Sequence, residues 1–131
     1  MNNIDIDALS GRELDIAVHK ELSGDTITFL CADGIHVVDW FEREIILKHY
    51  SSNIAAAWEL DGDGWEWSSD DAVLHEVDGK TMEVSVYIGP KSYNGLVKWS
   101  TMSEKAAAYA TARCRAWLKA KYAERGADNG A

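Results

Sequence analysis

Only two cysteines, Cys31 and Cys114, occur in this sequence of 131 residues, and they lie in different predicted elements. Neither belongs to a C-x-x-C motif, so the sequence offers no cysteine-based zinc or redox site, and we predict two buried free thiols. The sequence also lacks a run of eighteen apolar residues, and its N-terminus is acidic and polar instead of a basic-then-apolar leader. We therefore expect a soluble, cytoplasmic protein.

Catalytic and nucleotide-binding motifs are missing as well. No G-x-S-x-G, P-loop or dinucleotide fingerprint occurs, so a hydrolase or a nucleotide-cofactor enzyme is not expected. The four histidines lie on different predicted elements without H-x-x-x-H or H-E-x-x-H spacing, and we interpret them as ordinary residues: His19, His36, His49 and His75. The sequence thus predicts a protein that is not an enzyme and uses no cofactor.

One acidic stretch partly matches a calcium-binding loop. If the loop begins at Glu59, acids stand at positions 1, 3, 5 and 12 and a glycine at position 6, as Glu59, Asp61, Asp63, Asp70 and Gly64. The match fails at position 1, which is Glu, at position 8, which is Glu66, and at position 12, where Asp replaces a longer Glu. We interpret the stretch as a turn that ends a helix, and we predict no metal site.

Acidic side chains dominate the charge of the chain. The net charge of −9 disfavours nonspecific nucleic-acid binding, which depends on neutralising phosphates. Residues 1–100 carry 7 basic against 19 acidic side chains, a balance of −12, and no Lys or Arg lies between Lys48 and Lys80. Within that gap we place the candidate partner-binding residues Asp61, Asp63, Glu66, Asp70 and Asp71. The alternative is that they only keep the protein soluble.

Two tryptophans are candidates for ligand stacking. Trp65 and Trp67 are two residues apart on a predicted strand, so both side chains project from one face. They would stack on a base if the protein sequestered a nucleotide signal, or they pack beneath a helix. We favour packing, because a tryptophan pair beside helices more often belongs to the core.

Helical patterns cover three segments. The longest spans residues 101–125, where Thr101 and Glu104 have capping-box spacing and Gly126 suits the position after the last turn. Its predicted buried stripe is Ala106, Ala107, Ala110, Cys114, Trp117 and Leu118. A second helix over residues 11–22 starts at the N-cap Ser10 and ends at Gly24, with the stripe Leu14, Ala17, Val18 and Leu22. A short alanine-rich helix covers residues 52–60, and Tyr50-Ser51-Ser52-Asn53 offers several N-cap candidates for it.

Two Asp-Gly dipeptides predict β-hairpins. Asp33-Gly34 separates β-prone runs at 26–32 and 35–41, and a two-residue type I′ turn there would place one apolar set on a common face: Ile27, Phe29, Cys31, His36, Val38 and Trp40. Asp78-Gly79 predicts a second hairpin that pairs Val73, His75 and Val77 with Lys80, Met82 and Val84. Tyr93-Asn94-Gly95 predicts a further turn before a last strand at 96–99, and residues 42–49 stay open as a possible edge strand.

These elements predict a single α+β domain over residues 1–125, with a flexible C-terminal tail at 126–131. The expected architecture is α/β/α sandwich-like, with an antiparallel β-sheet of about four to six strands covered by the two longer helices.

Three segments resemble the motifs of the phage ABA sandwich domain family, small phage and prophage proteins of unknown function. They are Gly11-Arg12-Glu13-Leu14-Asp15, Tyr50-Ser51-Ser52-Asn53-Ile54-Ala55-Ala56-Ala57-Trp58-Glu59 and Ala110-Thr111-Ala112-Arg113-Cys114-Arg115-Ala116. The resemblance implies a sheet covered by helices and a bacterial host cell, and it carries over no catalytic residue.

We accordingly expect a non-enzymatic phage accessory protein. It would bind a host protein, for example one of the defence or takeover machineries, through its acidic surface. A small-ligand binder is the alternative function and a small enzyme the third. No membrane association is expected, and the sequence leaves a homo-oligomer open.

Overall fold

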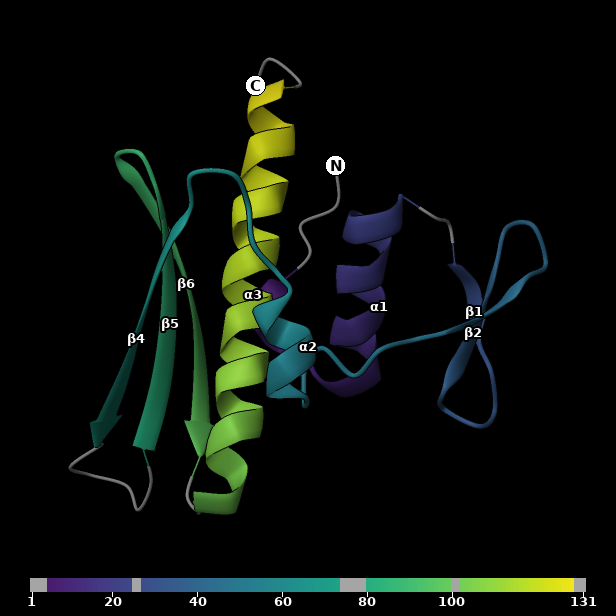
Figure 1. Cartoon of the computed structure of the whole chain (residues 1–131), viewed down its shortest axis with the longest axis horizontal. Coiled ribbons are helices and arrows are strands. Elements are labelled where there is room, and N and C mark those ends of the chain that lie inside the picture. Colours follow the sequence, from purple (N-terminus) through teal and green to yellow (C-terminus); the bar gives the residue numbers. More distant parts are fainter. Residues whose placement is uncertain (1–4, 25–26, 74–79, 100–101, 129–131) are drawn as a thin grey trace.

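Two three-stranded antiparallel sheets lie at opposite ends of the molecule, with the helices between them (Figure 1). The structure is a computed structural model that describes residues 5–24, 27–73, 80–99 and 102–128. The larger sheet has the strand order β4 (Glu66–Val73), β5 (Lys80–Ile88), β6 (Lys91–Trp99), and the smaller has the order β1 (Ile27–Leu30), β2 (His36–Asp39), β3 (Glu44–Ile46). The helices are the 3-10 turn η1 (Ile6–Ala8), α1 (Gly11–Ser23), α2 (Ile54–Trp58) and α3 (Met102–Asp128).

The predicted α+β class is confirmed, in one small domain. The strands do not join in one sheet of four to six, however, and the two longer helices do not both lie on a sheet. Instead α3 packs against β5 and β6, and α1 and α2 pack on α3 (Figure 1). The order of layers is therefore sheet, helix, helices, sheet. The reason lies in α3, which is buried on two sides.

The side of α3 that faces the larger sheet is lined by small residues. Four alanines spaced four apart are buried there: Ala108, Ala112, Ala116 and Ala120. They meet the buried side chains of β5, which come from alternate positions of the strand: Met82, Val84 and Val86. Because alanine adds little bulk, helix and sheet approach closely, and each strand residue that points inward fills the space left between the alanines.

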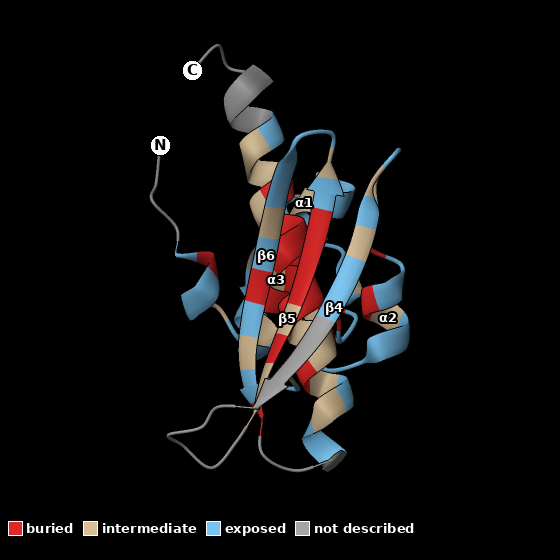
Figure 2. Cartoon of the chain, turned by 90° about the vertical axis from the view of Figure 1, so that its left-hand side faces the viewer, coloured by how far each residue is buried: buried red, intermediate tan, exposed pale blue. Residues whose placement is uncertain are grey.

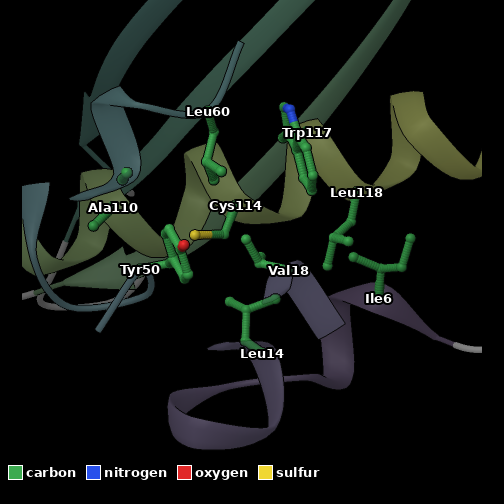
Figure 3. Close-up of a cluster of buried hydrophobic side chains, with 10 residues drawn as sticks. Ile6, Leu14, Val18, Tyr50, Leu60, Ala110, Cys114, Trp117 and Leu118 are labelled. Atoms are coloured by element: carbon green, nitrogen blue, oxygen red, sulfur yellow. The ribbon is translucent and has the colours of Figure 1, made fainter. Parts of the chain in front are cut away.

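The opposite side of α3 carries the bulky part of the core. Trp117, Leu118 and Cys114 pack there against Leu14 and Val18 of α1 (Figure 3). The predicted stripe of α3 is thus confirmed from Ala110 onward, whereas Ala106 is exposed. On α1 the stripe is likewise confirmed at Leu14 and Val18, but Leu22 is about half exposed because it lies in the last turn.

A close approach between β6 and α3 corrects the predicted turn at Tyr93-Asn94-Gly95. These residues lie inside β6, where Gly95 pairs with Val84. A Cβ atom on Gly95 would stand 2.1 Å from the carbonyl oxygen of Ala112. The glycine is therefore required by packing and not by a turn, which explains why the Asn-Gly pattern was misleading.

Replacing Gly95 with alanine is expected to destabilise the fold by about 1–3 kcal/mol, since strand and helix must separate to admit the methyl group. Urea denaturation measures this loss. Ser92→Ala is the matched control, because Ser92 is an exposed residue of the same strand, and the stability of this variant should change by less than about 0.5 kcal/mol. A Gly95→Ala variant as stable as the native protein would contradict the close approach.

The first predicted hairpin is confirmed in its pairing but not in its turn. Phe29 lies opposite Val38 and Leu30 opposite Val37, the register that a turn at Asp33-Gly34 predicts. Of the two turn residues only Gly34 has a positive φ, +72°, and a type I′ turn needs both. Asp33 instead accepts hydrogen bonds from the backbone of Ile35 and His36 with its side chain. This Asx-type cap stabilises a longer loop.

The second predicted hairpin is confirmed as antiparallel pairing of β4 with β5. Its register differs, because Val73 lies opposite Lys80, where a two-residue turn would put Val77. The shift is an even number of residues, so the same side chains of β5 still face the core. The dipeptide Asp78-Gly79 itself, with His75 and Val77, lies outside the described residues.

Helix ends follow the sequence signals in part. Gly24 closes α1 with φ +69°, and Asn53 caps α2 through its side chain, both as predicted. Ser10 is the N-cap of α1 but makes no side-chain cap hydrogen bond. Helix α3 continues through Gly126 to Asp128, so Gly126 does not end it, and Thr101 lies outside the described residues. In the described part of the chain, no helix combines the length and apolar character needed to cross a membrane.

Candidate functional site

The small sheet exposes large apolar side chains to solvent. Phe29 is 57% exposed, Trp40 69%, Phe41 71% and Ile46 64%. The register puts Phe29 beside Val38, and Ile46 beside His36, on the face of the sheet opposite to the buried Val37. Trp40 and Phe41 follow at the end of β2, in the turn to β3. We call Phe29, Trp40, Phe41 and Ile46 the exposed apolar surface of the small sheet.

The turn that carries Trp40 and Phe41 is held by a buried carboxylate. Asp39 Oδ1 accepts hydrogen bonds from the backbone N–H groups of Phe41 and Arg43, each at 2.9 Å, and Asp39 Oδ2 lies 2.7 Å from Arg43 Nε. Burial raises the pKa of Asp39, but the hydrogen bonds and the charge of Arg43 outweigh it and lower the pKa below its ordinary value. Glu42 has the left-handed φ of +61°. The hydrogen bonds to Asp39 hold the backbone of this turn in a defined conformation.

Beside this surface the structure brings together three side chains that the sequence pattern had kept apart. Asp33, His36 and Glu44 place one ligand atom each within 4.8 Å of one another. His36 Nδ1 lies 2.7 Å from Asp33 Oδ2 and 4.0 Å from Glu44 Oε1. The hydrogen bonds to Asp33, above all the one from His36, lower its pKa to about 2. This group is a candidate cation site, and its geometry depends on the pairing of β2 with β3.

One arginine connects the small sheet to the body of the protein. The guanidinium of Arg12 donates hydrogen bonds to the carbonyl oxygens of Leu47, Lys48 and Ile35. The same guanidinium pairs with the buried Asp15 at 2.7 Å. Because Asp15 also accepts from the backbone N–H of Ser51, α1 sets the position of the chain where it enters β2 and where it leaves β3.

The predicted acidic residues lie away from the small sheet. Asp61 has a structural role, since its Oδ1 accepts hydrogen bonds from Trp67 Nε1 at 2.9 Å and from the backbone N–H of Gly62. Asp63 is exposed, and Glu66 is exposed opposite Tyr87 on the face of the larger sheet that points away from α3 (Figure 2). Asp70 and Asp71 belong to β4, but their side chains fall outside the described part of the structure.

Trp65 and Trp67 are partly buried and pack against the core. Both are partly buried against the clusters beneath the larger sheet, with ring centroids 6.2 Å apart. The guanidinium of Arg113 already lies 3.8 Å from the centroid of Trp67. The packing interpretation therefore agrees with the geometry, and no observation favours the small-ligand alternative at these residues.

A hollow between the end of β3 and α2 has a volume of about 460 Å³. It is lined by Lys48, His49, Asn53, Ala55, Ala56 and Glu59. Its lysine and glutamate pair with each other at 3.1 Å, so the charges are already neutralised across it. We assign no ligand to this hollow.

Two functional features were missed by sequence reasoning. The turn residue Phe41 was not singled out, although the sequence Asp39-Trp40-Phe41 places two large aromatics beside a turn-forming acid. The cluster around His36 was missed because Glu44 lies eight residues along the chain, and only the i, i+3 spacing of Asp33 and His36 was visible. Comparison with known proteins finds no matching family model, no similar curated protein and no similar solved structure.

Proposed function

We propose that this protein is a non-enzymatic binding protein, and that it docks on a protein partner through the exposed apolar surface of the small sheet. The observation that carries the proposal is the exposure of Trp40 and Phe41 on a turn fixed by Asp39. Large exposed apolar patches mark interaction sites, and aromatic side chains supply most hot spots of protein interfaces. A turn held in its bound conformation also loses little entropy on binding.

Charge complementarity identifies the kind of partner. Three exposed carboxylates flank the apolar surface, those of Asp33, Glu42 and Glu44, while Arg43 is paired with Asp39. A second copy of this chain would bring these acids against their equivalents, which is unfavourable. We therefore infer a partner with an apolar pocket bordered by Lys and Arg. The resemblance to phage proteins supports a bacterial host protein as this partner.

The acidic residues predicted from the sequence have a different role in this proposal. Asp61, Asp63, Glu66, Asp70 and Asp71 belong to the strongly acidic part of a chain with net charge −9. Distant charges of this kind raise the association rate of a basic partner without entering the contact. The proposed function thus keeps an acidic contribution to binding but places the contact on the small sheet.

The double variant Trp40→Ala/Phe41→Ala is expected to bind the partner about 100-fold more weakly, because two hot-spot aromatics are lost. The partner is isolated from bacterial lysate with the native protein at low salt. The affinity is then measured on the purified pair by surface plasmon resonance. The loss should appear in the dissociation rate, which most interface mutations affect.

Tyr87→Ala/Leu96→Ala is the matched control, because both side chains are exposed apolar residues on the larger sheet. Its affinity should equal that of the native protein. Replacing Asp61, Asp63, Asp70 and Asp71 with Asn should lower the association rate and its salt dependence, but not change the dissociation rate. The proposal would be contradicted if the control lost as much affinity for the partner as the Trp40→Ala/Phe41→Ala variant. Light scattering would also contradict the proposal if the native protein and the Tyr87→Ala/Leu96→Ala control were dimers and the Trp40→Ala/Phe41→Ala variant a monomer.

A further inference from the structure

We propose that Asp33, His36 and Glu44 bind a divalent transition-metal ion of the zinc class. The site lies on the small sheet, on the strand face that also carries Phe29 and Ile46. It needs one imidazole nitrogen and one oxygen from each of two carboxylates. The proposal rests on the ligand geometry, but it shares Asp33 and Glu44 with the acidic border of the exposed apolar surface, so a bound ion would reduce the negative charge there.

The distances suit one ion between the three side chains. Zinc binds imidazole nitrogen and carboxylate oxygen at about 2.0–2.2 Å, so two ligand atoms on a tetrahedral ion lie about 3.3 Å apart. The observed separations from His36 Nδ1, 2.7 Å to Asp33 and 4.0 Å to Glu44, lie on either side of this value. Rotations of exposed side chains are sufficient to equalise them. His36 would bind as a neutral imidazole that carries its proton on Nε2.

The backbone orients two of the three ligands. Asp33 Oδ1 accepts hydrogen bonds from the N–H groups of Ile35 and His36 at 2.9 and 3.0 Å, which leaves Oδ2 free to face the imidazole. His36 lies opposite Ile46, and Glu44 opposite Val38, so strand pairing places Glu44 diagonally across from His36. Outer hydrogen bonds of this kind are what holds metal-binding carboxylates in place.

A hydrogen bond between Asp33 and His36 does not by itself account for Glu44. Glu44 places a second exposed carboxylate next to His36, which already has Asp33 as its acceptor, and two carboxylates this close repel each other. A bound cation would remove this electrostatic cost.

The mixture of donors selects the class of ion. Calcium and magnesium prefer sites built of oxygen alone, whereas imidazole nitrogen suits zinc and its neighbours in the first transition row. Three protein ligands leave at least one coordination position open, as in zinc sites that bind water or an outside ligand. The site differs from the stretch that begins at Glu59, which resembles a calcium loop and lies elsewhere in the chain.

Zinc titration of the full chain tests the proposal by isothermal calorimetry, with zinc chloride as the only ligand. One equivalent should bind, and the melting temperature should rise with zinc concentration by mass action. His36→Asn should abolish this equivalent. Asp33→Asn and Glu44→Gln should each weaken it at least about tenfold. Asp33→Asn retains the oxygen that accepts from the backbone, so it removes the charge without removing the loop cap.

Glu42→Gln is the matched control, because Glu42 is an exposed carboxylate two residues from Glu44 and outside the cluster. It should bind zinc as the native protein does. Cys31→Ser should also retain binding, since the thiol is not one of the three ligands. The proposal is overturned if the native chain binds no equivalent of zinc, or if Glu42→Gln weakens binding as much as Glu44→Gln. Loss of binding in Cys31→Ser alone would also overturn it.

Discussion

Replacing Arg113 with alanine is expected to lower the free energy of unfolding by about 3–5 kcal/mol. Arg113 is only 1% exposed, and its guanidinium donates to the carbonyl oxygens of Ala57 at 2.9 Å and Leu60 at 2.6 Å. These carbonyls belong to the end of α2 and the residues after it. Without the arginine the Leu60 carbonyl would lose this donor, while the Ala57 carbonyl would keep its 3.0 Å bond from the Leu60 N–H. A buried carbonyl that loses its donor costs more than the net value of the bond itself.

The aromatic contacts of Arg113 add to this loss. Its Cζ atom lies 3.8 Å from the ring centroid of Trp67 and 4.7 Å from that of Trp58. One side chain thus joins α3 to α2 and to the first strand of the larger sheet. Chemical denaturation followed by tryptophan fluorescence measures the change in stability.

Arg113→Lys provides the sharper comparison. A lysine keeps the charge but lacks the planar fork that reaches two carbonyls and stacks on a ring. It should therefore recover less than half of the lost stability. Lys91→Ala serves as the control, because Lys91 is an exposed cation at the start of β6. If Arg113→Ala cost less than about 1 kcal/mol, the assigned role of Arg113 would be wrong.

The second large effect is expected for Asp15→Ala, a loss of about 3 kcal/mol. The carboxylate of Asp15 is buried and accepts from Ser51 N at 2.7 Å and from Arg12 Nη1 at 2.7 Å. Its removal leaves a buried backbone N–H group without its acceptor and a guanidinium without its counter-ion. The same guanidinium holds the chain just before β2 and just after β3, so the small sheet should loosen as well.

Hydrogen exchange distinguishes this local effect from general destabilisation. In Asp15→Ala the amides of β2 and β3 should exchange faster than global unfolding alone explains. The amides of β5 should exchange only as fast as global unfolding explains. Ser51→Ala is the control, because it removes only the hydroxyl bond to Gly11 and keeps the backbone bond to Asp15. Uniform acceleration across both sheets would contradict the role of Asp15 as an anchor for the small sheet.

The features that the sequence predicted correctly depend on neighbours along the chain. Helix α1 begins after Ser10 and ends at Gly24, and Asn53 caps α2, because capping involves residues at most four apart. The pairing of β1 with β2 followed from the turn at Asp33 and Gly34. The alternation in β5 identified the inward side chains for the same reason, since successive residues of a strand face opposite ways.

The features that were predicted wrongly, or missed, depend on which other element packs against a given face of a helix or strand. Periodicity shows which side chains share a face, but not whether another element covers that face. Trp40, which the strand pattern placed on a common apolar face, is left in solvent on the small sheet, whereas Trp65 and Trp67 are partly buried, as the packing interpretation expected. The glycine of β6 is explained only by the carbonyl of Ala112, which comes from a helix that begins later in the chain.

By itself, then, the sequence determined the helices, the antiparallel strand pairs and the α+β class, because each is set by local backbone preferences and by short-range patterns. Only the tertiary structure decided that α3 has two buried sides, that the strands divide into two sheets, and that His36 meets Glu44 across a strand pair. The physical reason is that burial and ligand geometry are properties of surfaces brought together in space. Both candidate sites, the exposed apolar surface of the small sheet and the group of Asp33, His36 and Glu44, depend on tertiary structure in this way.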